Sequence, residues 1–150
     1  MIVLVAGLAV AGGCVPSALT TPADYVRLAK PPYPYYYKAV SAEGVSLAMR
    51  QEDNPEGGTV EFWAAALKNQ LVGARGYTLR GESAAASADG VAGKRMDFTA
   101  NLQGRDMAYL VAVWVEGKAI IIVEAGGPKE KFAADRAKIE AALKTVRVKS

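Results

Sequence analysis

The chain has 150 residues, of which 51% are apolar and 22% charged, a balance that favours one globular domain with a buried core. The formal net charge is +3 and the cations are scattered along the sequence, so we expect no nucleic-acid partner, which would need a clustered basic face. The sequence contains no histidine and a single cysteine, which excludes histidine-based catalysis, a Cys–His nucleophile pair and an internal disulfide.

The first thirteen residues, MIVLVAGLAVAGG, are apolar or small and carry no charge. A helix of this length rises about 20 Å, less than the roughly 30 Å hydrocarbon core of a bilayer, so we do not expect it to span one. The length of the segment and the small residues at its end match a secretory signal peptide, which we predict for residues 1–13.

The last four residues of this stretch, AGGC (Ala11 to Cys14), resemble a bacterial lipobox. The resemblance implies that the Cys14 sulfur receives a diacylglyceryl group and that, after cleavage, the new amino group is acylated, for example with palmitate. The alternative is that Cys14 is a small buried core residue. The segment lacks the Lys or Arg that normally begins a signal, which leaves open whether Met1 is the true start. By similarity to enterobacterial sorting, Val15 implies the outer membrane, facing the periplasm, rather than the inner membrane.

Residues 14–34 are predicted to form a tether, because five prolines fall between Val15 and Pro34. Proline fixes its own φ and cannot donate a hydrogen bond, so the segment is expected to be extended rather than part of the core. At about 3.1 Å per residue, it would hold the domain up to roughly 60 Å from the membrane.

Four tyrosines, Tyr33, Tyr35, Tyr36 and Tyr37, lie beside prolines in PPYPYYYKAV. They permit two interpretations. In one, they form an aromatic platform for a partner, with Tyr33 and Tyr36 as the candidate surface residues. In the other, which we favour because tyrosine is a good strand residue, Tyr35 and Tyr37 pack on one face of the first strand and Tyr36 lies on the other.

The remaining residues, 35–150, are predicted to form one domain without repeats or an internal linker. YYYKAVSAE and VSLAMRQE indicate two strands around Gly44, with Val45, Leu47 and Met49 on one face. Thr59 is a candidate cap for a helix from Val60 to about Val72. The apolar face of that helix is predicted to contain Val60, Trp63, Leu67 and Leu71.

The second half of the domain is predicted to be mostly strand. YTLRGESAAAS indicates one irregular strand, and Met96, Phe98, Ala100 and Leu102 are predicted to face inward from the next. MAYLVAVWV and AIIIVEA predict a hairpin of central strands covered on both faces. Pro128 suits the first turn of a final helix, whose apolar stripe is Phe132, Arg136, Ile139, Leu143 and Val146, broken only by the arginine.

The element order strand, strand, helix, several antiparallel strands, helix resembles that of the PsbP-like superfamily, which includes photosystem PsbP proteins, a Ran-binding nuclear import factor and DcrB-type bacterial lipoproteins. The resemblance covers Tyr35 to Val148 and rests also on FWAAALKNQLVGARGYTL, DGVAGKRMDF and FAADRAKIEAALKTV. It implies an α+β fold in which an antiparallel sheet packs with two main helices as an α/β/α sandwich. Because known members mostly act as accessory or binding proteins, it also implies a non-catalytic role.

Several near-motifs lack a residue that their chemistry requires. DGVAGKRM contains the Gly–Lys of a phosphate-binding loop, but Ala88 replaces the first glycine and Arg95 stands where Ser or Thr would coordinate magnesium. Asp53 and Glu56 lack the alternating oxygen ligands of a calcium loop. Glu52 and Asp53 form a carboxylate pair, but nothing distinguishes them from surface charge. We therefore expect no enzymatic activity, no cofactor and no metal.

The sequence thus favours a lipid-anchored protein of the bacterial cell envelope, attached to the membrane through Cys14, whose domain binds another envelope protein. The alternative is a periplasmic carrier or sensor that holds a small apolar ligand between sheet and helix, and a hydrolase that uses carboxylates is third. An apolar cavity beneath the 60–72 helix would favour the carrier. A filled core with an exposed aromatic patch would favour the interaction module.

Overall fold

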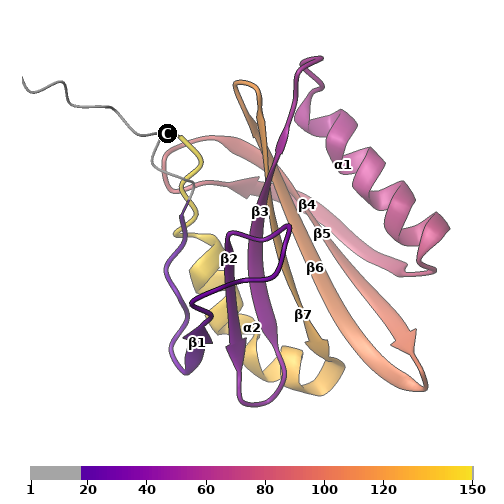
Figure 1. Cartoon of the computed structure of the whole chain (residues 1–150). Coiled ribbons are helices and arrows are strands. Elements are labelled where there is room, and N and C mark those ends of the chain that lie inside the picture. The colour runs from indigo at the N-terminus through magenta and orange to yellow at the C-terminus, as the bar shows by residue number, and fades with distance from the viewer. Residues whose placement is uncertain (1–17, 150) are drawn as a thin grey trace, which may run out of the picture.

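The computed structural model describes residues 18–149, which form one antiparallel sheet of seven strands with a helix on each face (Figure 1). The elements in chain order are β1 (Tyr25–Arg27), β2 (Tyr37–Ser41), β3 (Ser46–Asp53), α1 (Val60–Asn69), the π-helical turn η1 (Gln70–Ala74), β4 (Thr78–Ala86), β5 (Ala92–Leu102), β6 (Arg105–Glu116), β7 (Ala119–Pro128) and α2 (Lys129–Leu143). Within residues 18–149, no helix is both long and apolar enough to cross a membrane.

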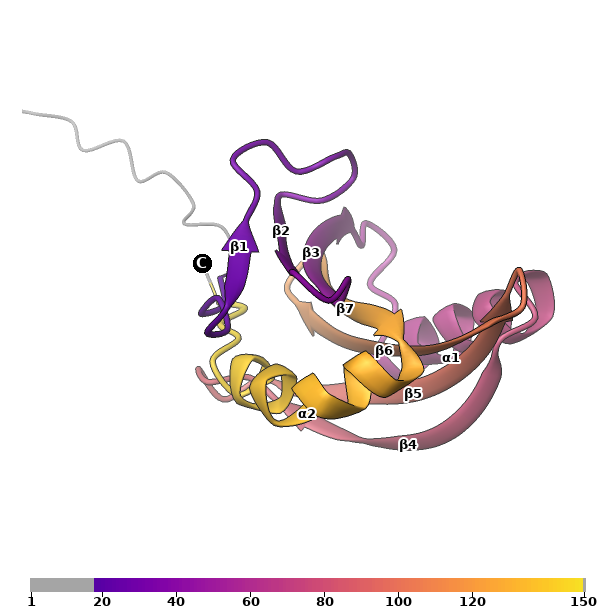
Figure 2. The same ribbon diagram turned by 90° about the horizontal axis from the view of Figure 1, so that it is seen from below.

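The strand order in the sheet is β1-β2-β3-β7-β6-β5-β4, so β4 to β7 form a meander whose last strand returns beside β3. The sheet is strongly curved (Figure 2). Glycines allow two of its tight turns: Gly44 between β2 and β3, at the predicted turn, has φ +84°, and Gly90 between β4 and β5 has φ +85°. The central hairpin β6–β7 is covered on both faces from Leu110 to Trp114 and from Ile120 to Val123, which confirms the prediction for that part of its apolar run.

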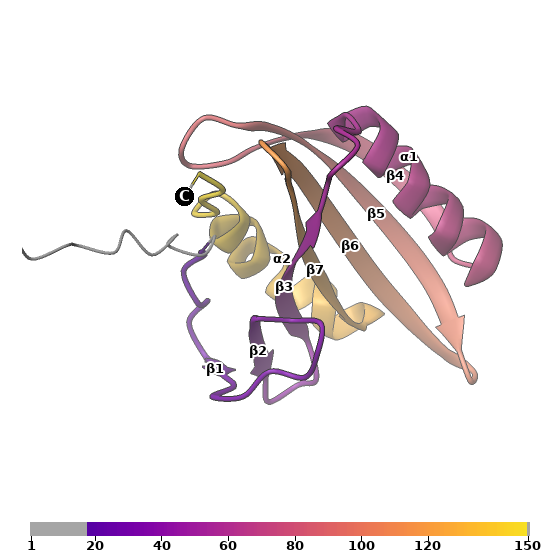
Figure 3. The same ribbon diagram turned by 45° about the horizontal axis from the view of Figure 1, so that its top comes forward.

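The helix α1 covers only the β4–β7 part of its face of the sheet, away from β1 and β2 (Figure 3). Its cap is the predicted one, because the Thr59 hydroxyl accepts a 3.2 Å hydrogen bond from the Phe62 amide. The buried residues of this α1-side core are Ala64, Leu71, Met96, Phe98, Val111, Val113, Ile120 and Ile122. Leu102, predicted to face inward with them, is 43% exposed, because β5 runs past the end of the helix.

The helix α2 packs on the opposite face, where Phe132 and Ile139 are almost completely buried. Arg136, the break in its apolar stripe, donates a 3.0 Å hydrogen bond to Asp97 on β5. Asp97 also pairs with Arg95, which in turn binds Glu140 of the helix, so one ionic network ties α2 to the sheet. Val45, Leu47 and Met49 of the second predicted strand are buried on this same side, as expected.

The N-terminal segment corrects the predicted domain boundary at residue 35. From Ala18 onward, the chain expected to be a tether lies against the domain: Ala18 bridges to Arg147, and β1 pairs with β2. Tyr25 is 8% exposed within the α2-side core, and its hydroxyl donates a 2.8 Å hydrogen bond to Asp135 of α2. Prolines at positions 22, 31, 32 and 34 flank β1 rather than interrupt it, which is why proline content misled the prediction.

Asp89 ties the β4–β5 turn to the end of the described chain. Its carboxylate accepts hydrogen bonds from the Ser87 hydroxyl at 2.6 Å and from the amides of Val148 and Lys149 at 3.0 and 2.8 Å. Desolvation raises the pKa of Asp89, but the bonds from Ser87, Lys149 and Val148 outweigh it and lower that pKa to about 2.

Candidate functional site

A trough runs beside α1 on the part of the sheet that the helix leaves uncovered. It has two compartments, which we name by what borders them. The helix compartment, of about 480 Å³, lies between α1 and the loop that contains Pro34 and Tyr35. The strand compartment, of about 250 Å³, lies over β3, β7 and β6. Tyr35, Tyr109 and Glu124 border both compartments and form the waist between them.

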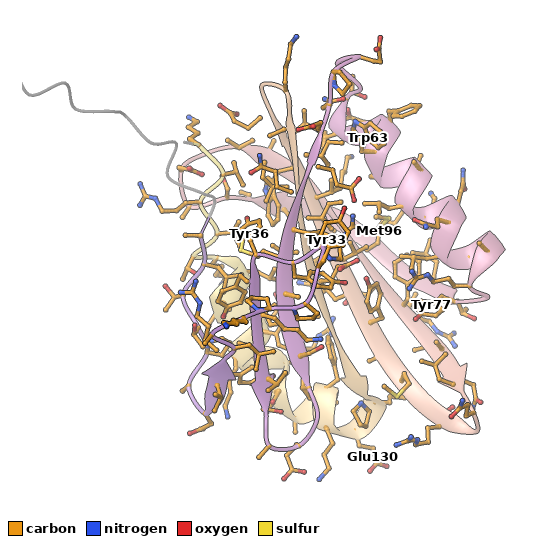
Figure 4. All side chains as sticks on the ribbon, in the orientation of Figure 1. Tyr33, Tyr36, Trp63, Tyr77, Met96 and Glu130 are labelled. Carbon is orange, nitrogen blue, oxygen red and sulfur yellow. The ribbon has the colours of Figure 1, made fainter. Side chains whose placement is uncertain are left out.

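The walls of the trough are positioned by packing and by hydrogen bonds. Trp63 lies on α1 (Figure 4). Its Nε1 donates to the side-chain oxygen of buried Asn54 at 3.0 Å, which fixes the indole. Asn54 also exchanges two hydrogen bonds with the backbone of Gly58. Tyr77, after η1, packs edge-on against Tyr109 with ring centroids 5.5 Å apart. The rings that line the trough are therefore held in place before any ligand arrives.

The waist is a polar cluster set among apolar strands. The Tyr109 hydroxyl donates a 2.7 Å hydrogen bond to Glu124 Oε1. Arg50 on β3 lies with its Nε 3.6 Å from Glu124 Oε2, an ion pair too long to be a hydrogen bond, and it also pairs with Glu52. The side chains of Arg50 and Glu124 are each only 14% exposed. Glu124 Oε2 is buried and accepts no hydrogen bond from the described residues, so one acceptor at the waist is open.

The two waist tyrosines stay protonated at physiological pH. Desolvation, followed by the charge of Glu124, raises the pKa of Tyr109 far above its ordinary value. Desolvation and the neighbouring Glu124 carboxylate likewise raise the pKa of Tyr35 to about 12. Both phenols therefore keep their protons, Tyr109 donates its own to Glu124, and the waist suits the recognition of a polar group.

Two cations on the trough walls have no carboxylate partner among residues 18–149. Lys38 lies over the ring of Tyr35, with its Nζ 5.9 Å from the centroid, and Arg75 is exposed beside the helix compartment. No ion pair involves either side chain in the described part of the chain. The trough therefore presents unpaired positive charge at both compartments.

The residues predicted from the sequence fall mostly outside this site. Cys14 lies outside the described residues. Tyr33 is 97% exposed on the loop that borders the trough, whereas Tyr36 is partly buried against the α2-side core (Figure 4). Tyr35 and Tyr37 do not share a face as expected, because β2 begins only at Tyr37, and Tyr35 belongs to the loop at the waist.

The candidate carboxylate pair is also not brought together. Glu52 and Asp53 are neighbours on β3, and successive strand residues point to opposite faces of a sheet. Sequence reasoning overlooked Arg50, Tyr109 and Glu124. The signal was present: Glu124 is the one charged residue in the predicted strand AIIIVEA, where an ionisable group needs a reason to be buried. Within residues 18–149, no group of three His, Cys, Asp or Glu side chains could hold a metal ion.

Solved structures share this architecture, although no protein-family model and no curated protein sequence matches the chain. LpqN from Mycobacterium tuberculosis, described as involved in cell envelope biogenesis, aligns over 89% of this chain and 83% of its own, with a TM-score of 0.71 and 14% identity. Mog1p, a Ran-binding protein from Saccharomyces cerevisiae, aligns over 88% and 89%, with a TM-score of 0.62 and 9% identity.

The cyanobacterial PsbP of Synechocystis sp. PCC 6803 aligns over 95% of this chain and 98% of its own, with a TM-score of 0.58 and 11% identity. Such low identities establish a shared architecture and no shared activity. The α+β architecture expected from the element order is confirmed: this chain has the PsbP-like fold.

Proposed function

We propose that this protein is a lipid-anchored component of the bacterial cell envelope and that its domain is a non-catalytic accessory or protein-interaction module. The observation that carries the proposal is the likeness of almost the whole described domain to LpqN, a protein involved in envelope biogenesis. The lipobox-like AGGC at Ala11 to Cys14 supports the anchor independently of the fold. Because Val15 follows the cysteine, similarity to enterobacterial sorting favours an anchor in the outer membrane and a domain that faces the periplasm.

The surface of the domain supports an interaction module over an apolar-ligand carrier. Beneath α1 the sheet is filled by buried side chains, and the hollow lies instead at the edge of the helix, with Arg50 and Glu124 in its floor. An apolar ligand would leave those charged groups without partners. Exposed aromatic rings stand nearby, Tyr33 on the loop and Phe62 at the start of α1, which is typical of protein-binding surfaces.

The anchor is tested by fractionation of native cells. Because two lipid signals suffice for stable membrane attachment, the wild-type protein should sediment with membranes and its mature N-terminus should carry acyl chains in mass spectrometry. The Cys14→Ala protein should remain unprocessed and lack lipid. An unmodified thiol on membrane-extracted wild-type protein would refute the anchor.

The interaction role is tested by cross-linking in intact envelopes, with a photoreactive amino acid in place of exposed Tyr33. We expect one envelope protein to be recovered as a discrete cross-linked band, identified by mass spectrometry. The same probe at Lys144, exposed on the opposite side of the domain, is the matched control. Recovery of no protein from either position would argue against an interaction module.

A further inference from the structure

The trough has the shape of a site for an elongated molecule. It follows β3 and β7 along their length, from Ile120 in the helix compartment to Gly126 in the strand compartment. These six residue steps correspond to about 20 Å of strand. A compact ligand would occupy one compartment, whereas an extended chain of about six residues would span both.

Small residues keep the strand compartment open. The small residues of its floor and walls include Ser46, Ala48, Ala100 and Gly126. Where a helix covers a sheet, the strand positions that face the helix usually hold large apolar side chains. Met96 and Phe98 beneath α1 are examples. The helix α1 does not cover this end of the sheet, and the small side chains leave room for a peptide segment to lie directly on the strands.

Each compartment offers an apolar contact on its own side of the waist. The helix compartment is bordered by Trp63, Leu67 and Leu71. The strand compartment is bordered by Met107 and by Leu102, the exposed leucine that the sequence placed in the core. An occupant therefore needs two apolar groups, separated by a polar stretch that crosses the waist.

The waist selects a hydrogen-bond donor. Glu124 Oε2 is buried and borders both compartments, and its other oxygen is already taken by Tyr109. Buried polar atoms normally find a partner. A backbone N–H supplies the missing donor without carrying a charge, and an extended peptide presents one every second residue toward a given side.

The charge of the walls selects among peptides. Lys38 and Arg75 border opposite compartments without carboxylate partners in the described chain, whereas Arg50 and Glu124 largely compensate each other. An occupant with acidic residues near both ends would be attracted to these cations, and complementary charge accelerates and orients association.

We infer that the trough binds an extended, acidic peptide segment of a partner protein, with one apolar side chain in each compartment and a backbone amide donated to Glu124. The inference rests on the proposed function, because it assigns to the interaction module the place and the chemistry of its partner. The two apolar side chains would lie on the order of four residues apart, given the length of the trough.

The test uses the full chain with Cys14→Ser, which blocks lipid attachment, and random twelve-residue peptides displayed on phage. Selected peptides should contain acidic residues and two spaced apolar residues. Arg75→Glu and Lys38→Glu should each weaken binding of a selected peptide about fivefold or more, and Glu124→Gln about tenfold. Lys144→Glu makes the same charge change on an exposed residue on the opposite side of the domain and should change binding less than about twofold.

Amide chemical shifts locate the peptide. In a ¹⁵N-labelled sample, resonances of Ala48 and Gly126 should move on titration, while that of Ala85, on the far side of the sheet, should not. Circular dichroism of each variant shows whether it has kept its fold. A second probe is monomeric dihexanoyl phosphatidylcholine, a short amphiphile without peptide bonds.

Three results would overturn the inference: no peptide is enriched, selected peptides bind Arg75→Glu and Lys144→Glu equally well, or the amphiphile moves the trough resonances while peptides do not. These failures are distinguishable from failure of the proposed function. If envelope cross-linking recovers a partner but the trough selects no peptide, the partner binds elsewhere and only the trough assignment is wrong. If Cys14 carries no lipid, the anchor is wrong whatever the trough binds.

Discussion

Tyr25 provides the most direct test of whether the N-terminal segment is part of the folded domain. The residue lies in β1, seven positions after the first described residue, in a segment whose prolines predict an extended tether. In the structure its ring is 8% exposed in the α2-side core, and its hydroxyl donates to Asp135 of α2 at 2.8 Å. Truncation of this side chain should therefore destabilise the whole domain.

The magnitude follows from the two contacts. Replacement of a buried aromatic ring by alanine costs about 3–5 kcal/mol, and β1 is a short edge strand that can partly relax, so we expect about 3 kcal/mol for Tyr25→Ala. Tyr25→Phe keeps the ring and removes only the hydrogen bond to the Asp135 carboxylate, so we expect a loss of about 1.5 kcal/mol. Burial of Tyr25, together with Asp135, raises the pKa of the phenol, so the hydroxyl remains a donor up to strongly alkaline pH.

Urea denaturation of the full chain, followed by tryptophan fluorescence, measures both changes, since Trp114 is 1% exposed in the same core. Tyr33→Ala is the matched control, because that ring is 97% exposed and its loss should change the free energy of unfolding by less than about 0.5 kcal/mol. If Tyr25→Ala is as mild as Tyr33→Ala, the segment before β2 is not part of the core. A double-mutant cycle tests the hydrogen bond itself. If Tyr25 and Asp135 interact as described, Asp135→Asn should lower the free energy of unfolding much less in the Tyr25→Phe background than in the wild type.

Three further predictions concern other parts of the domain. Asn54→Ala should lower the free energy of unfolding by about 2–4 kcal/mol in chemical denaturation, because it removes a buried side chain and three hydrogen bonds; a loss below about 1 kcal/mol would contradict its role. Asp89→Asn should lower the free energy of unfolding by about 1 kcal/mol at neutral pH, after allowance for solvent screening. Because folding lowers the pKa of Asp89 from 3.8 to about 2, this difference from wild type should vanish as the pH falls through that interval. A pH-independent difference would contradict the assignment. Arg50→Met with Glu124→Leu and Tyr109→Phe should leave the free energy of unfolding unchanged or raise it by about 1–4 kcal/mol in thermal denaturation. Glu124→Leu alone should lower it, because the buried Arg50 and the Tyr109 hydroxyl then lose their partner.

The sequence predicts much of the fold because local patterns and tertiary packing agree over most of the domain. Alternation in VSLAM, the Thr59 cap and the glycine at position 44 each depend on interactions within a few residues, and each is found where expected. The irregular character of β4 is also confirmed, because its pairing with β5 shifts register between Leu79 and Gly81.

The sequence-based predictions are wrong where contacts between residues far apart in the sequence determine the structure. Nothing near Tyr25 indicates that its partner is Asp135, 110 positions away, or that a three-residue strand would find a place on the sheet edge. The exposure of Leu102 depends on where α1 ends over β5. The alternation of residues within β5 gives no information about that position. Which face of a sheet a helix covers, and how far, is a property of the assembled domain.

The waist of the trough combines both situations. At the waist, Tyr109 and Glu124 lie beside Arg50. These three residues come from β6, β7 and β3, and only the strand order β3-β7-β6 brings them side by side. Desolvation of a charged pair between central strands opposes folding, and hydrophobic side chains of similar size would fill the same positions with less cost. At the surface of an uncovered sheet the same pair gives an otherwise apolar trough an open acceptor beside two protonated phenols. The arrangement is thus poorly explained by stability and well explained by recognition, which makes the waist, rather than the exposed tyrosines of the loop, the first place to look for a partner.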